Sequence, residues 1–166
     1  MPVGFIKKLF TFKKDKEVID YDFYRNVSLF ENLTDKEISL IADLSITKLY
    51  KQDEMVFKEN HPQVVIYIVK TGRVLLHIDL PHLEFKLAVI TPSNHFGEIG
   101  LFHDVNRIST ATAMEDTELI AIKKSDLKHF ILQNPATGIK LLYNFGKSVV
   151  IRLVETSKLI RQNEFN

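Results

Sequence analysis

Cysteine and tryptophan are absent from this 166-residue chain, and glycine and proline are scarce, at six and five residues. Without cysteine there are no disulfides, thiolate metal ligands or cysteine nucleophiles, and the chain suits a reducing compartment. The 45% hydrophobic and 26% charged residues are typical of a folded globular protein and exclude a collagen-like or disordered chain. At this length we expect one domain with a full core.

An excess of charge of either sign is lacking too, because the net charge is only +1. The whole chain therefore carries no electrostatic signal for nucleic acid, and any basic surface must be local. One such place is the basic N-terminal segment (residues 1–20), where MPVGFIKKLFTFKK has four lysines, no acid and an apolar helical face. Its lysines interrupt the apolar run too often for a signal peptide or a membrane span.

Two interpretations of the basic N-terminal segment stay open. Residues 5–14 form an amphipathic helix that contacts an anionic membrane surface or a partner protein, or the helix packs on its own domain and exposes its lysines to water. We expect the protein in the cytoplasm, and the first interpretation places it at the inner face of the membrane.

A helical pattern follows from Tyr21 to Leu44. Within it, Thr34 and Glu37 have the spacing of a capping box, which predicts a helix starting at Asp35. After Ile46 the pattern changes to short β-rich runs separated by turn-like segments. The seven runs are ITKLY, MVF, VVIYIV, RVLLHI, FKLAVI, TATA and ELIAI.

Seven short strands with tight turns predict a sandwich or barrel over about residues 45–123. Gly72 and Asn60 fall at turns that suit a positive φ. Helical periodicity returns over residues 125–162, with Ser125 as the expected N-cap and Pro135 as a break or a new helix start. Residues 136–161 then form one long helix. The order is N-terminal helices, a β-domain and a long C-terminal helix.

The stretch FGEIGLFHDVNRISTATA carries the chemistry of the chain. Gly97 and Gly100 allow a close backbone approach, and a helical turn starting near Glu98 points free N–H groups outward, which suits an anion. Arg107 returns toward the same turn and can bind a phosphate through two charge-assisted bonds. Glu98 needs a donor instead, such as a sugar hydroxyl. A ligand with a phosphate beside a ribose hydroxyl satisfies both residues.

This stretch resembles the phosphate-binding cassette of the cyclic nucleotide-binding domain family. The pattern is met by Phe96, Gly97, Glu98, Gly100, Leu101, Arg107, Ser109 and Thr110. The similarity extends from LFENLTDKEI to the terminal helices and covers residues 21–166. It implies a mainly β fold, a β-roll (jelly-roll-like) with N-terminal helices and a long C-terminal helix.

The resemblance also implies roles for the site residues. Glu98 binds the ribose hydroxyl and Arg107 the cyclic phosphate. The backbone amides of Ile99, Gly100 and Ile108 complete the cradle around them, and Gly97 and Ser109 belong to the same motif.

One departure from the family pattern is Ser93-Asn94, where the family usually has Gly-Asp. The alternative to a binding site is that Glu98 and Arg107 form an ordinary salt bridge in a fold that has lost its ligand.

The residue after the arginine bears on the choice of nucleotide. Members that prefer cGMP tend to have threonine there, whereas Ile108 cannot donate a hydrogen bond, so cAMP is favoured over cGMP. RLVETSKLI resembles the segment of bacterial cAMP-receptor transcription factors in which a Thr-Ser pair reads the adenine across a dimer. Thr156 and Ser157 are therefore further candidate ligand residues.

A heptad-like seam in the same helix predicts a homodimer, or equally a stripe that packs on its own β-roll. The seam consists of Leu142, Gly146, Val149, Leu153, Thr156 and Ile160.

The sequence bears on three classes of function. The leading hypothesis is a cyclic nucleotide sensor that closes its terminal helix over the roll and signals to a protein partner, a membrane or its own dimer. The alternative is a ligand-free β-roll interaction protein that works through the basic N-terminal segment. An enzyme is not expected, because the chain has no nucleophile elbow or Walker loop and its six histidines lack metal-ligand spacing. We also expect no metal and no nucleic-acid binding, since no winged helix follows before Asn166.

Overall fold

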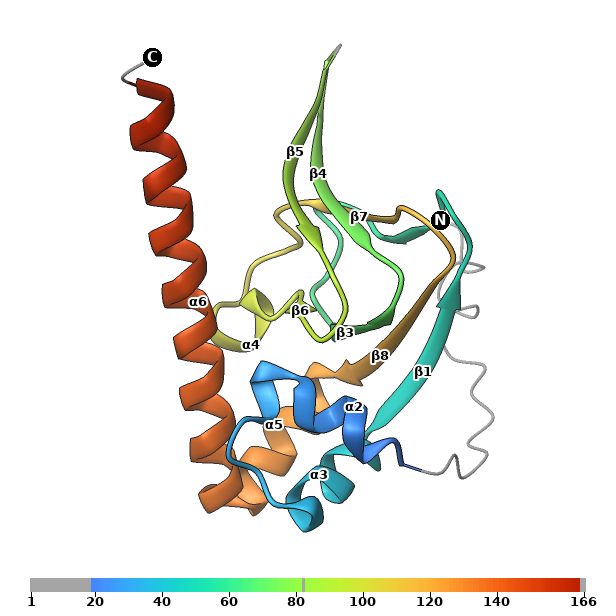
Figure 1. Cartoon of the computed structure of the whole chain (residues 1–166), viewed down its shortest axis with the longest axis vertical. Helices are drawn as coiled ribbons and strands as arrows, with labels where there is room; N and C mark the ends of the chain where they lie inside the picture. The colour runs from blue at the N-terminus through green and yellow to red at the C-terminus, as the bar shows by residue number, and fades with distance from the viewer. Residues whose placement is uncertain (1–18, 82, 165–166) are drawn as a thin grey trace.

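The computed structural model describes residues 19–81 and 83–164 (Figure 1). Most of the basic N-terminal segment, residues 1–18, lies outside this part, so its predicted helix and membrane contact stay predictions. Among the described residues, no helix is long and apolar enough to cross a membrane.

The N-terminal helical region is broken into three pieces rather than running from Tyr21 to Leu44. The pieces are α2 (Tyr21–Asn26), the 3-10 turn η1 (Ser28–Phe30) and α3 (Asp35–Ala42). The first break falls at Val27, whose backbone is extended (φ −81°, ψ 119°), and the second at Asn32, whose φ of 65° is incompatible with a helix. The capping box is confirmed, because Glu37 Oε2 accepts the Thr34 N–H at 2.7 Å and Thr34 Oγ1 accepts the Glu37 N–H at 3.3 Å.

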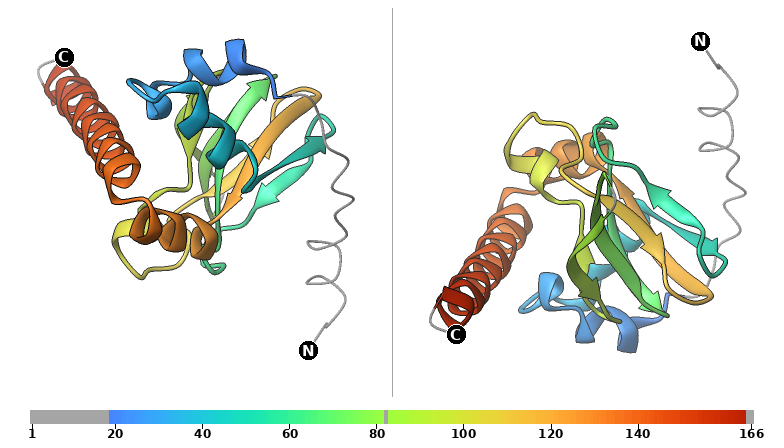
Figure 2. Two further views of the ribbon diagram at one scale, coloured as in Figure 1. Left: turned by 90° about the horizontal axis from the view of Figure 1, so that it is seen from below. Right: turned by 90° about the horizontal axis from the view of Figure 1, so that it is seen from above.

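Two antiparallel sheets of four strands each form the β-roll, with orders β1-β8-β3-β6 and β2-β7-β4-β5 (Figures 1 and 2). The strands are β1 (Ser45–Tyr50), β2 (Met55–Phe57), β3 (Val65–Thr71), β4 (Val74–Leu80), β5 (Leu83–Ile90), β6 (His95–Phe96), β7 (Thr110–Ala113) and β8 (Thr117–Lys123). The predicted fold class is thus confirmed. The two-residue strand β6 was missed, because two residues carry no readable alternation.

Two predicted turns are also confirmed. Gly72 has φ 79° between β3 and β4, and Asn60 has φ 65° before β3. Ser93 lies in the Ser93-Asn94 turn, where the sequence departs from the usual Gly-Asp of the family. It adopts φ 66°, so the chain keeps a left-handed turn there without glycine.

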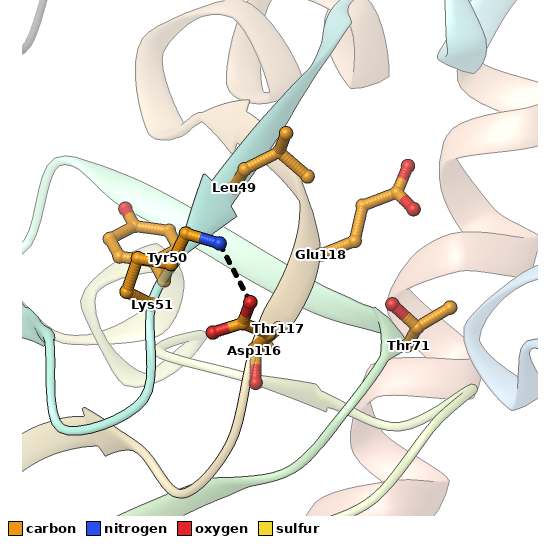
Figure 3. Close-up of a pocket in the computed structure, with 7 residues that line it drawn as sticks. All are labelled: Leu49, Tyr50, Lys51, Thr71, Asp116, Thr117 and Glu118. Carbon is orange, nitrogen blue, oxygen red and sulfur yellow. Dashed lines mark hydrogen bonds and ion pairs between the residues drawn. The ribbon is translucent and has the colours of Figure 1, made fainter.

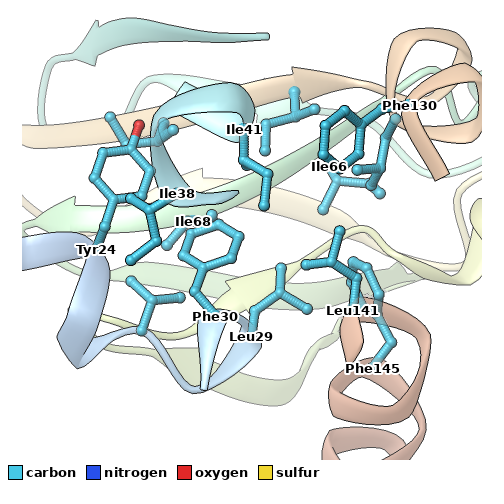
Figure 4. Close-up of a cluster of buried hydrophobic side chains, with 14 of the residues drawn as sticks. Tyr24, Leu29, Phe30, Ile38, Ile41, Ile66, Ile68, Phe130, Leu141 and Phe145 are labelled. Carbon is cyan, nitrogen blue, oxygen red and sulfur yellow. The ribbon is translucent and has the colours of Figure 1, made fainter. Parts of the chain in front are cut away.

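Strand β3 separates two hydrophobic clusters through its alternation. Ile66 and Ile68 face the helices and pack with the N-terminal region, α5 and α6 (Figure 4). Tyr67 and Val69 face the inside of the roll, where they pack with Phe96. Period-two patterning therefore places helices on one face of the first sheet and the second sheet on the other.

The C-terminal helices are α5 (Lys124–Gln133) and α6 (Pro135–Glu164). The expected cap at Ser125 is wrong, because β8 runs directly into α5 and the N-cap position falls on Lys123. Ser125 lies in the first turn, and its hydroxyl donates to Asp126. Pro135 starts α6, consistent with the preference of proline for a first helical turn.

The N-terminal half of α6 is tied to the N-terminal helices. Glu37 accepts hydrogen bonds from Thr137 Oγ1 and Lys140 Nζ, and Asn144 Nδ2 donates to the carbonyl oxygens of Leu29 and Glu31. This end of α6 therefore has a fixed position, whereas its C-terminal half rises beside the roll (Figure 1).

Leu142, Val149 and Leu153 of the heptad-like seam, whose side chains the structure describes, do not pack on the β-roll of their own chain. Leu141 and Phe145 face the core instead, while Leu142, Val149 and Leu153 are 39%, 44% and 64% exposed. A side chain added at Gly146 would also meet open space.

Candidate functional site

The cassette turn is built around Gly97, which follows β6 and has φ 78°. A Cβ at Gly97 would lie 2.4 Å from Arg107 Nη1, so glycine is required both by the backbone conformation and by the close approach of the guanidinium. Glu98 then forms the N-cap of the short helix α4 (Ile99–Phe102). The predicted helical turn near Glu98 is confirmed.

Arg107 is buried, at 4% exposed, and its guanidinium lies under the cassette turn. Nη1 donates to the Gly97 carbonyl at 3.2 Å, and Nη2 donates to the Val65 carbonyl at 2.6 Å. The guanidinium also lies 3.9 Å from the ring centroid of Phe57. Burial lowers the pKa of Arg107 to about 10, although nearby Tyr67 opposes this shift.

The charge of Arg107 is not matched by a carboxylate at salt-bridge distance within the described part of the chain. Its Nε is buried and has no hydrogen-bond partner there. A buried cation that binds only neutral carbonyls and an aromatic face is costly unless an anion joins it. The arrangement therefore suits an anionic ligand.

Glu98 pairs with Arg152 of α6, not with Arg107, so the salt bridge considered as the alternative to a binding site is not formed. The Glu98 side chain is 4% exposed, and Arg152 Nη2 also donates to the His95 carbonyl. Arg152 was missed by sequence reasoning. The sequence feature that could have identified Arg152 is its spacing from Phe145 and Ser148, which places the three residues on the helix face that points toward the roll.

His95 forms a second link between the cassette and α6. Its Nε2 lies 3.1 Å from Ser148 Oγ. Its ring packs edge-to-face on the ring of Phe145, with 5.2 Å between the ring centroids. Burial, with a smaller contribution from Arg152, lowers the pKa of His95 to about 3, so the imidazole is neutral. The ring centroid of Phe145 also lies 5.8 Å from that of Phe102 in α4, so α6 packs against the cassette helix itself.

The other predicted site residues separate into two groups. Ser109 is buried beside Arg107, while Ile99 and Ile108 are exposed at the cassette surface. Thr156 and Ser157 lie on an exposed part of α6, where their hydroxyls donate to the carbonyls of Arg152 and Leu153. A single chain thus brings the cassette residues together, but it leaves the Thr-Ser pair on the open helix face.

A separate groove of about 270 Å³ lies where β1 ends and β8 begins (Figure 3). Lys51 pairs there with Asp116 at 2.7 Å, and Glu118 pairs with Lys70 at 3.0 Å. These charged groups are satisfied by one another, unlike Arg107, so the groove is the weaker candidate. The described residues also contain no cluster of three or more side chains able to hold a metal ion.

Comparison with known proteins identifies the family of the chain. The family description "Cyclic nucleotide-binding domain" matches residues 47–134, and the chain belongs to this family. The Cyclic AMP receptor protein of Thermus thermophilus is 32% identical over 114 residues, covering 68% of this chain and 53% of that protein. This family is in general regulatory rather than catalytic.

Solved structures agree with the fold. The Catabolite Activator Protein of Thermus thermophilus has a TM-score of 0.71 at 29% identity, over 83% of this chain and 63% of that one. A putative cyclic nucleotide-binding protein from Geobacter metallireducens has a TM-score of 0.71 at 25% identity, over 82% and 99%. The chain spans about half the length of the Thermus receptor and 34% of a putative potassium channel protein from Rhodopseudomonas palustris.

Proposed function

We propose that this protein is a cyclic nucleotide sensor, that cAMP is its ligand in preference to cGMP, and that binding is signalled through α6. The observation that carries the proposal is the buried guanidinium of Arg107, whose Nε has no partner within the described part of the chain. The cyclic phosphate supplies the missing anion. The name of the Thermus relative, Cyclic AMP receptor protein, supports this choice of ligand.

The residue roles follow from chemistry and position. Arg107 binds the phosphate, Glu98 accepts a ribose hydroxyl, and backbone amides around α4 and Ile108 surround the anion. Ile108 has no hydroxyl for a guanine, which favours cAMP.

Glu98 provides the connection from the ligand to α6. A carboxylate has about four acceptor positions, so Glu98 can hold Arg152 and a ribose hydroxyl together. A ligand bound there lies against the same carboxylate that fastens α6, and it adds contacts beneath the helix. Binding and helix docking are then coupled, and each strengthens the other.

The output of the sensor is a homodimer or a protein partner that contacts α6. Exposed apolar side chains on this helix, including Val149 and Leu153, support such a contact. Thr156 and Ser157 would meet the adenine of the partner chain in a dimer. The interaction-protein hypothesis keeps the same fold but binds no nucleotide, and it relies on residues 5–14 at a cytoplasmic membrane surface or a partner.

Isothermal titration with cAMP and cGMP tests the proposal. We expect saturable cAMP binding, and a loss of roughly 2 to 5 kcal/mol in binding free energy in Arg107→Ala. Arg107→Lys, which keeps the charge but not the fork of donors, should lose part of it. Arg73→Ala, at an exposed arginine, is the matched control. No binding by the intact protein would support the interaction-protein hypothesis instead.

A further inference from the structure

Gln63 is a buried polar side chain, 5% exposed, that connects the two halves of the cassette. Its Oε1 accepts the N–H of Gly100 in the first turn of α4 at 3.0 Å. Its Nε2 donates to the carbonyl of Asn106, the residue before Arg107, at 2.9 Å. One side chain thus spans from the cassette helix to the loop that carries the arginine.

The backbone beside Gln63 is joined to the same loop. The Asn60 N–H donates to the Arg107 carbonyl, and the Arg107 N–H donates to the His61 carbonyl, both at 2.8 Å. The main chain around Arg107 is therefore held by residues 60–61, while the carboxamide of Gln63 extends the attachment to α4.

The packing at Gly100 shows how close this contact is. A Cβ at Gly100 would lie 2.5 Å from the Cβ of Gln63, so no larger residue fits without displacement. The contact also requires a carboxamide. Glutamate lacks the donor for the Asn106 carbonyl, asparagine is one methylene shorter, and an apolar residue would leave both buried backbone groups without a partner.

We propose that Gln63 is a positioning residue for the phosphate site: it fixes the separation between the first turn of α4 and Arg107. This inference rests on the proposed function. Gln63 itself does not touch the nucleotide in this account. Because its Oε1 already takes the Gly100 N–H, Gly100 serves as the anchor of the bridge. The phosphate is then left to Arg107 and the neighbouring amides of Ile99 and Ile108.

The test compares Gln63→Met with Gln133→Met, a matched substitution at an exposed glutamine of α5. Titration with cAMP should show about tenfold or greater weakening for Gln63→Met, because two buried hydrogen bonds that set the site are lost. Gln133→Met should bind as the intact protein does. The ³¹P chemical shift of bound cAMP should move only in the Gln63 variant, since this signal reports the surroundings of the phosphate rather than stability.

A second variant keeps the test decisive if Gln63→Met folds poorly. Gln63→Glu retains an acceptor for Gly100 but loses the donor to Asn106 and adds a negative charge near the phosphate, so it should also bind more weakly. Unchanged or tighter cAMP binding by a folded Gln63 variant would overturn the inference. Tighter binding would mean that Gln63 competes with the ligand for Gly100. Failure of the intact protein to bind cAMP would overturn the proposed function and this inference with it.

Discussion

At the scale of single residues, position 97 requires glycine for two reasons, one in the backbone and one in the binding site. Its φ is 78°, and the Arg107 guanidinium occupies the space that a Cβ would need. Both conditions are local to the binding turn, so a substitution there affects ligand binding directly as well as the backbone.

We predict that Gly97→Ala destabilises the protein by more than about 1 kcal/mol, since the left-handed conformation and the contact with Arg107 both oppose a side chain. It should also weaken cAMP binding by displacing the guanidinium. Gly146→Ala is the control, because its Cβ meets nothing within 4 Å in a helix, and it should stabilise by up to about 1 kcal/mol. Urea unfolding measures both variants, and equal effects would contradict the account.

His95 gives a pH dependence with a defined sign. Its pKa falls from 6.5 to about 3 because it is buried and lies near Arg152, so the folded protein excludes a proton that the unfolded chain binds. The contribution of His95 to stability is complete above pH 6.5 and is lost as the pH falls from there toward about 3, by up to about 1.4 kcal/mol per pH unit.

The measurement is urea unfolding between pH 7 and about pH 5.5, where carboxylates of ordinary pKa remain mostly ionised. His95→Gln cannot take up this proton and should show a flatter dependence than the intact protein. His103→Gln, at an exposed histidine, should not. An equally steep decline in His95→Gln would show that another group is responsible.

The sequence allowed some of these residues to be predicted and not others. Glu98 and Arg107 lie nine positions apart in one motif, so their proximity was readable from the pattern. Gln63 and Arg152 reach the cassette from positions 37 and 54 residues away from their partners, and only the folded chain brings them there.

At the scale of elements, Glu37 joins α3 to α6. Its carboxylate caps α3 and also accepts from Thr137 and Lys140 of α6. The backbone hydrogen bond from Thr34, with smaller contributions from the α6 side chains, lowers the pKa of Glu37 to about 2. The capping box was predicted from the sequence, whereas its second role depends on the path of α6 and was not.

We predict that Glu37→Ala lowers the free energy of unfolding by about 2 kcal/mol, because a cap and charge-assisted hydrogen bonds are lost together. Glu31→Ala is the matched control. It removes an exposed ion pair with Lys147 on the same helix, and it should cost less than about 1 kcal/mol. Urea unfolding at neutral pH compares them, and a similar cost for both would rule out this role of Glu37.

The elements themselves were predictable where they are long or strongly patterned. The long C-terminal helix and seven of the strands follow from periodicity and turn residues. The two-residue strand β6 was not predictable, because it is defined only by its pairing with β3. The start of α5 was not predictable either, because β8 continues directly into the helix.

At the scale of the whole molecule, α6 connects the cassette with an exposed apolar face. Within the described residues, no other element covers Val149 and Leu153, which are exposed. Arg152, which lies between them in the sequence, forms an ion pair with Glu98. A helix that contacts the ligand site on one side and presents apolar residues on the other can carry a binding event to a second chain.

We predict that the protein forms a dimer through this face. Sedimentation velocity over a range of concentrations should show a monomer–dimer equilibrium, and Leu153→Glu should shift it toward monomer. Leu132→Glu, at an exposed leucine of α5, is the control and should leave the equilibrium unchanged. A monomer at all concentrations, with and without cAMP, would contradict a dimeric output.

Hydrogen–deuterium exchange with and without saturating cAMP tests the central claim most directly, since it reports binding at the cassette and the response of α6 together. The account predicts slower exchange in the cassette, residues 96–108, and in residues 145–157 of α6, with α5 unchanged. Arg152→Ala should keep the first effect and lose most of the second. Protection of the cassette with no change in α6 of the intact protein would contradict the account, because the ligand would then bind without signalling through that helix.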